Sequence, residues 1–338
     1  TRQLGQIEES NKFVDRAIAA NPTAVAPRVI AAQTLIESNQ HLKALSLIQD
    51  VANENVNHPG ILMVMGRAQI GAGKAGQAAN TLERLVRLQP QSPGAHFLLA
   101  QAYSLLGNQA RARAEIEEAL KLEPDFLEAG IANIRSLVLS GKNDEANAHL
   151  QTLKSKHAED PSIKKLESWV ALKQGRPGEA VTILTNLQSK QNDWATTNEL
   201  AVAHWQNKDG ENSIETIRNW VRNNPDHYPS KLQLANYLTL SNRQDEAIVL
   251  WENIIETTPD NWPVLNNLAA ALVGKTPEKA LGYAERAYKL NPSSPSVELT
   301  LATALLANSR ETDRAGKLAA SVVKRFPDDV SAGILLAR

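Results

Sequence analysis

A small side chain recurs along this chain at intervals of 33 to 35 residues, and this period constrains the fold more than any other feature. Nine positions share the period, and eight of them are alanine: Ala44, Ala78, Ala112, Ala146, Ala180, Ser213, Ala247, Ala280 and Ala315. Such a period is typical of repeat architectures, in which each repeat buries its apolar face against its neighbours. We therefore expect a stack of similar units and no single compact core.

Two further positions follow the same period. Twelve residues before the alanines, small or apolar residues recur, namely Ala32, Gly66, Ala100, Ile134, Ser168, Val202, Ala235 and Ala302. Seven residues after them, larger apolar residues recur, namely Val51, Leu85, Ala119, Leu153, Leu187, Trp220 and Ile254. Between these positions the apolar residues are three and four apart, which predicts two amphipathic helices in each repeat.

The segments between the predicted helices carry residues that end helices. Gly107-Asn108 and Gly141-Lys142 stand between the two helices of a repeat, and a proline follows the second helix in many copies. Each repeat thus reads as helix, tight turn, helix, turn. The small residues have a physical reason, because two antiparallel helices approach to ~8–10 Å only where one side offers Ala or Gly.

This pattern resembles the tetratricopeptide repeat, and the segment from Pro93 to Phe126 is the clearest copy. The resemblance implies an all-α fold, a right-handed superhelical solenoid of helix-turn-helix units (an α-α superhelix). It implies a second helix of a truncated repeat in residues 1–24, nine tandem repeats in 25–329 and a truncated first helix in 330–338. The tryptophan found early in the family's repeats is absent here, and Arg28, Leu62, His96 and Lys231 stand in its place.

Composition excludes several classes of function. A net charge of −1 and a pI near 6.7 lack the basic footprint of a nucleic-acid binder. No apolar run approaches the ~20 residues of a membrane span, so we expect no transmembrane segment in this sequence. The absence of cysteine excludes disulfides, thiolate zinc sites and cysteine nucleophiles. Because the sequence begins at Thr1, we expect it to be a segment of a longer protein.

Several motifs resemble catalytic or cofactor sites without their required context. Gly71, Gly73 and Gly76 match the GxGxxG dinucleotide fingerprint, but that fingerprint needs a preceding strand, and here it falls in the turn between two predicted helices. No two of the seven histidines are four residues apart, and no serine lies in a GxSxG elbow. We expect no cofactor, no metal and no catalytic centre; the sequence predicts that the chain is not an enzyme.

The resemblance implies that the first helices line the concave wall of the solenoid, where a partner would bind. The residues expected there combine long hydrogen-bonding side chains with exposed apolar ones, which suits an extended protein or peptide segment. They are Met63, Arg67, Phe97, Gln101, Arg135, Trp169, Asn236 and Asn267. Asn236 and Asn267 also match the asparagines of the family's chaperone-tail clamp, but Leu232, Ser296 and Thr300 occupy the places of its cations.

A narrower resemblance lies between Trp262 and Arg325. The strings Asn266-Asn267-Leu268-Ala269 and Pro277-Glu278-Lys279-Ala280-Leu281 are similar to those of tetratricopeptide-repeat lipoproteins of bacterial PEP-CTERM/exopolysaccharide systems. This resemblance implies a periplasmic scaffold, anchored to the outer membrane, that binds machinery for polysaccharide or protein export. Two alternatives stay open: a regulatory or substrate-recruiting arm of a larger enzyme such as a glycosyltransferase, and a cytosolic cochaperone.

Overall fold

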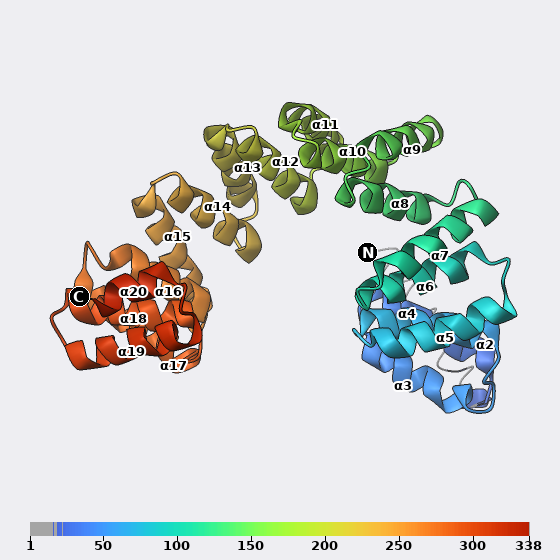
Figure 1. Cartoon of the computed structure of the whole chain (residues 1–338), viewed down its shortest axis with the longest axis horizontal. Helices are drawn as coiled ribbons and strands as arrows, with labels where there is room; N and C mark the ends of the chain where they lie inside the picture. Colours follow the sequence, from blue (N-terminus) through green and yellow to red (C-terminus); the bar gives the residue numbers. More distant parts are fainter. Residues whose placement is uncertain (1–15, 17–18, 22, 338) are drawn as a thin grey trace. The chain divides into compact units, whose positions relative to one another are not determined.

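The computed structural model describes residues 16, 19–21 and 23–337, and the second helix expected in residues 1–24 lies almost entirely outside them. Within the described residues the chain folds into nineteen α-helices without any strand, as the sequence predicts (Figure 1). The helices form two compact units, Thr1–Gln174 (unit 1) and Gly175–Arg338 (unit 2). Each unit is an α-α solenoid in its own right.

The first helices of successive repeats alternate with the second helices that pack against them. In unit 1 the helices are α2 (Val25–Glu37), α3 (His41–Ala52), α4 (Pro59–Gly71), α5 (Ala75–Leu88), α6 (Pro93–Leu105), α7 (Gln109–Leu122), α8 (Leu127–Leu139), α9 (Asn143–Lys156) and α10 (Pro161–Lys173). In unit 2 they are α11 (Pro177–Lys190), α12 (Trp194–Gln206), α13 (Gly210–Asn223), α14 (Tyr228–Leu240), α15 (Gln244–Thr257), α16 (Trp262–Leu272), α17 (Pro277–Leu290), α18 (Pro295–Ala307), α19 (Thr312–Arg325) and α20 (Val330–Leu336).

The hairpin of α6 and α7 shows how the sequence sets these boundaries. The Ser92 hydroxyl accepts the backbone N–H of Ala95, and Pro93 occupies the first helical position, so α6 begins there. Gly107 then adopts a φ of 74°, a left-handed conformation that ends the helix. Asn108 caps α7 in the same manner as Ser92 caps α6. The segment from Gly71 to Gly76 forms the equivalent turn between α4 and α5, which confirms its reading as a turn.

The periodic small residues lie where the helices touch. All nine positions that begin with Ala44 are at most 3% exposed. Gly66 on α4 shows how close the approach is, because a Cβ atom there would lie 2.4 Å from the Leu82 side chain of α5. These contacts confirm the packing role predicted for the small residues.

One predicted position is wrong. Val202 is only partly buried, and its neighbour Ala201 takes the small position at 0% exposure. The spacing shortens to 33 residues between Ala180 and Ser213, which moves the register of the first helix by one residue. The Ser213 hydroxyl donates to the carbonyl oxygen of Ala201 at 2.8 Å, so the only non-alanine in the series is satisfied by the residue that faces it.

Polar pairs replace the family's early tryptophan. Buried Arg28 donates to Asp50 at 2.8 Å and to the Leu47 carbonyl oxygen at 2.9 Å. Buried His96 lies 2.6 Å from a Glu115 oxygen. In each case the partner lies on the second helix of the same repeat. A charge-assisted hydrogen bond thus joins the two helices where a large ring would otherwise fill the space.

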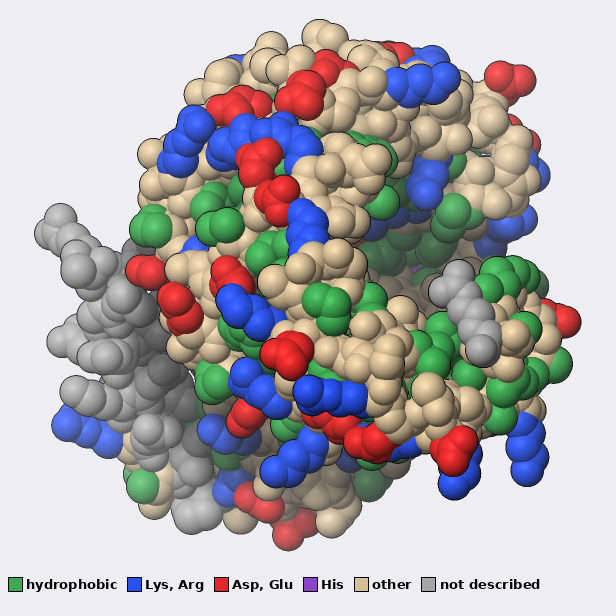
Figure 2. All heavy atoms as spheres, turned by 90° about the vertical axis from the view of Figure 1, so that its left-hand side faces the viewer, with side chains coloured by type: hydrophobic (Ala, Val, Ile, Leu, Met, Phe, Trp, Pro, Cys, Tyr) green, Lys and Arg blue, Asp and Glu red, His purple; other side chains and the backbone are tan. Residues whose placement is uncertain are grey.

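Ion pairs between successive repeats are regular in unit 2. A cation in or beside the inner turn pairs with an acid in the first turn of the preceding second helix: Arg243 with Glu211, Lys275 with Asp245, and Arg310 with Glu278. Figure 2 shows side chains of both charges interspersed over the face that it presents. Each exposed pair contributes little alone, but the repeated arrangement links each second helix to the next.

A pair of glycine substitutions tests the close approach of α4 and α5. Gly66→Ala forces Leu82 to move and should lower the free energy of unfolding by about 1–3 kcal/mol. Gly76→Ala is the matched control, because nothing lies within 4 Å of its Cβ position on α5 and alanine favours the helix. Urea unfolding of both variants measures the difference. Equal effects of the two substitutions would contradict the packing role of Gly66.

Acid should weaken unit 2 through its ion pairs. The hydrogen bond from Arg243 lowers the pKa of Glu246, and that from Arg218 lowers the pKa of Glu215. A carboxyl group whose pKa is lowered by folding stabilises the fold above its unfolded pKa, and this contribution is lost as the pH falls through the folded pKa. We therefore expect unit 2 to lose stability below about pH 4.5.

Tryptophan fluorescence reports this loss, since five of the six tryptophans lie in unit 2. The midpoint of urea unfolding should fall between pH 7 and pH 3.5, and the fall should be smaller in an Arg243→Gln variant, which lacks the bond that lowers the pKa of Glu246. The same fall in both proteins would show that these pairs do not control the acid response.

Candidate partner-binding pockets

A pocket of about 440 Å³ opens between α6, α7 and α8 in unit 1 (the unit-1 pocket). First helices of neighbouring repeats pack directly against each other at α2–α4, α4–α6 and α8–α10. No comparable packing joins α6 to α8 in this described part of the chain. The pocket lies in that gap.

The floor of the unit-1 pocket is apolar. Ala100, Ala112 and Ile116 contribute buried side chains from α6 and α7, and Ile131 contributes a half-buried one from α8. Phe97 also lines it, and its ring meets Phe126, the N-cap residue of α8, edge to face with centroids 5.4 Å apart and planes at 70°. This contact fixes the Phe97 ring at the entrance of α8, as aromatic pairs of this geometry do.

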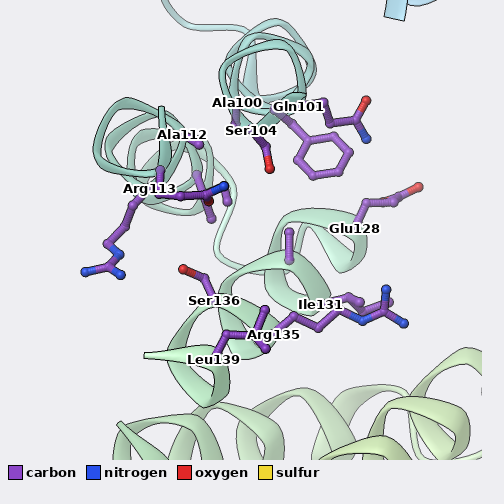
Figure 3. A pocket seen from close by; sticks show the side chains of 14 residues that line it. Ala100, Gln101, Ser104, Ala112, Arg113, Glu128, Ile131, Arg135, Ser136 and Leu139 are labelled. Atoms are coloured by element: carbon purple, nitrogen blue, oxygen red, sulfur yellow. The ribbon is translucent and has the colours of Figure 1, made fainter. Parts of the chain in front are cut away.

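The rim of the unit-1 pocket is polar. In Figure 3, Gln101 from α6 and Glu128 and Arg135 from α8 extend toward the same side of the pocket, and Arg113 from α7 lies at the other side. Arg113 donates to the Ser140 hydroxyl at 3.2 Å. The rim therefore offers an amide, a carboxylate and a guanidinium around one mouth, above an apolar floor.

Arg135 also contacts the next repeat. Its guanidinium lies over the Trp169 ring of α10, 5.6 Å from the centroid. The Lys173 ammonium, one helical turn beyond Trp169, lies 5.9 Å from the same centroid. Two cations thus share one indole beside the unit-1 pocket, and we call Arg135, Trp169 and Lys173 the cationic cluster.

A second pocket, of about 520 Å³, lies between α14, α15 and α16 in unit 2 (the unit-2 pocket). It repeats the first one position by position. Gln101, Ser104 and Gln109 correspond to Asn236, Thr239 and Gln244, each 135 residues later. As between α6 and α8, close packing is missing between the described helices α14 and α16.

The two pockets differ in charge. Arg135 corresponds to Ala270, and Glu128 to Pro263. Every polar residue that lines the unit-2 pocket is neutral: Asn236, Thr239, Gln244, Trp251 and Asn267. The shared geometry comes from the repeat, and the chemistry comes from a few side chains placed on it.

Comparison with known proteins agrees with this architecture. The family model of the tetratricopeptide repeat matches residues 63–125 and 165–228. The chain is built from tetratricopeptide repeats. A tetratricopeptide repeat protein from Parabacteroides merdae is similar in structure, with a TM-score of 0.51 and 15% identity over 73% of this chain and 98% of that one. The structure of the APC/C hetero-tetramer Cut9–Hcn1 gives a TM-score of 0.50 and 15% identity over 97% of this chain and 58% of that chain.

A sequence relative is cellulose synthase operon protein C of Escherichia coli strain K12. It is 42% identical over 59 residues, which are 18% of this chain. The match spans only 5% of that relative's length. The similarity therefore concerns less than two tetratricopeptide repeats.

The predicted partner-binding residues are distributed over three places. Phe97, Gln101 and Arg135 line the unit-1 pocket, with Trp169 beside Arg135. Asn236 and Asn267 line the unit-2 pocket. Met63 packs half-buried against the core around Leu82, and Arg67 is exposed on α4; these two line neither pocket.

Sequence reasoning missed Arg113, Glu128 and Lys173. Arg113 belongs to a second helix, and the search for binding residues had covered only first helices. Lys173 lies four residues after Trp169, on the same face of α10, and this spacing could have found it. No helix among the described residues is long and apolar enough to cross a bilayer, and those residues contain no group of His, Asp and Glu arranged to hold a metal.

The aromatic pair at the unit-1 pocket can be tested by a double-mutant cycle. Phe97→Leu and Phe126→Leu each keep an apolar side chain but remove the edge-to-face contact. We expect a coupling energy of about 0.5–1.5 kcal/mol from urea unfolding of the two single variants and the double variant. A coupling energy near zero would mean that the two rings do not stabilise each other.

Proposed function

We propose that this protein is a non-catalytic scaffold that binds an extended segment of a partner protein in the unit-1 pocket. The observation that carries this proposal is the pocket itself, where a gap between first helices exposes an apolar floor beneath polar side chains. A buried apolar anchor surrounded by hydrogen-bonding groups is the usual composition of a peptide-binding hot spot. The fold of tetratricopeptide repeats is consistent with such a role.

The polar rim suits a peptide main chain. The Gln101 carboxamide can donate to a carbonyl oxygen and accept from an N–H, so it can satisfy both groups of one peptide unit. The floor formed by Ala100, Ile116 and Ile131 can take an alternate side chain of the same segment. The pocket holds one carboxylate, Glu128, and no histidine, which favours binding over acid–base chemistry.

We further propose that this scaffold works in a bacterial envelope, in the export of an exopolysaccharide or of proteins. Two observations support this setting: the similarity to cellulose synthase operon protein C, and the strings between Trp262 and Arg325 that resemble lipoproteins of exopolysaccharide systems. The protein would then lie in the periplasm, anchored to the outer membrane, with export machinery as its partner.

Site-specific photo-crosslinking in the organism that encodes the protein tests the binding site. A photo-reactive residue at Gln101 should give one defined adduct, and the same residue at exposed Glu117 on α7 should not. Ala132→Phe fills the pocket and should abolish the adduct, whereas Ala110→Phe at an exposed position of α7 should leave it unchanged. An adduct that survives Ala132→Phe would place binding elsewhere.

Fractionation tests the setting. The full-length protein should be released with the outer-membrane or periplasmic fraction, and deletion of its gene should reduce surface polysaccharide or secreted protein. Recovery with the cytosolic fraction would contradict the envelope proposal and leave the binding proposal standing.

A further inference from the structure

The cationic cluster beside the unit-1 pocket has a feature that the fold does not require. Arg135 and Lys173 lie over one indole ring, at 5.6 and 5.9 Å from its centroid. Two like charges that share a ring raise each other's energy, and an anion placed near both lowers it. The Trp169 side chain, half-buried, supplies a flat apolar wall for whatever binds there.

No ion pair of the described residues engages Arg135 or Lys173. Elsewhere in the chain arginine is usually matched by an acid, as Arg28 is by Asp50 and Arg314 by Glu285. The positive charge of the cluster is therefore open to a ligand.

The unit-2 pocket shows that the repeat folds without these charges. Ala270 stands where Arg135 stands in unit 1. The ninth and thirteenth residues of α10 are Trp169 and Lys173, and those of α18 are Thr303 and Ala307. The cluster is thus an addition to one pocket of two that share a geometry, which indicates a role in selecting a ligand.

The cluster is continuous with the apolar floor, because Arg135 lines the pocket and also contacts Trp169. Glu128 lies two helical turns before Arg135 on α8, about 10 Å along the helix axis. That distance corresponds to about three residues of an extended chain. Glu128 repels a carboxylate at its own end of the pocket, so the charges of α8 also give the ligand a direction.

We propose, as a refinement of the proposed function, that the unit-1 pocket selects a peptide segment with an apolar side chain next to an aspartate or glutamate. The apolar side chain lies on the floor formed by Phe97 and Ile131, and the carboxylate lies between Arg135 and Lys173. An acidic polysaccharide could satisfy the two cations, but it carries no apolar side chain for the floor. The continuity of floor and cluster therefore favours the peptide.

Selection from a random library of twelve-residue peptides, displayed on phage and panned against the full chain, tests this proposal. The selected sequences should be enriched in Leu, Ile, Met or Phe adjacent to Asp or Glu. A synthetic peptide of the consensus should bind about five- to tenfold more weakly when Asn replaces its Asp, as expected for two solvent-exposed charge contacts.

Variants of the cluster provide the matched comparison. Arg135→Ala with Lys173→Gln introduces the neutral character of the unit-2 pocket and should remove the preference for Asp over Asn. Arg87→Gln removes an exposed cation of α5 and should leave the preference unchanged. Circular dichroism confirms that the helices of each variant are intact.

The outcomes separate this inference from the function on which it rests. Enrichment of apolar residues with equal binding of the Asp and Asn peptides would overturn the inference and leave peptide binding in place. A library without any enriched peptide would overturn both. Alginate that binds the full chain and is lost with Arg135→Ala and Lys173→Gln, while no peptide binds, would replace the peptide by an acidic polysaccharide.

Discussion

The close approach of paired helices at small side chains is the interaction on which the rest of this structure depends. Ala44 and its eight successors lie in the contact between helices, and the Gly66 position has no room for a Cβ beside Leu82. Because each repeat is held by contacts to its own partner helix and to its neighbours, the chain needs no large aromatic core. Only 4% of its residues are aromatic, and most of the packing is done by alanine and leucine.

This mode of packing leaves the outward positions of the first helices free to vary. A residue such as Arg135 can change to alanine, as at Ala270, without touching the contact between the helices of its repeat. The polar pairs inside the repeats follow the same logic. His96 and Arg28 replace a large ring with a charge-assisted bond, and the helices keep their places.

Much of the fold could be predicted from the sequence, since the small positions and the turn residues recur with a fixed period. Ser92, Pro93 and Gly107 carry the boundaries of α6 in their own conformational preferences. The error at Val202 came from a single shortened repeat, where the period alone does not tell which of two neighbouring residues faces inward. Ser213 and its bond to Ala201 fix the register, and this bond is visible only in three dimensions.

The candidate site was harder to predict, because it depends on a missing contact. Sequence periodicity describes what each helix presents to its partner, but the gap between α6 and α8 is a property of how two repeats stack. Arg113 enters the unit-1 pocket from a second helix for that reason, and Lys173 joins Arg135 only because Trp169 lies between them. Both pockets occupy the same positions of the repeat, so the stacking gap supplies the geometry, and substitutions on the surrounding surface supply the selectivity. A repeat protein built in this manner can acquire a new ligand without altering the contacts that hold it together.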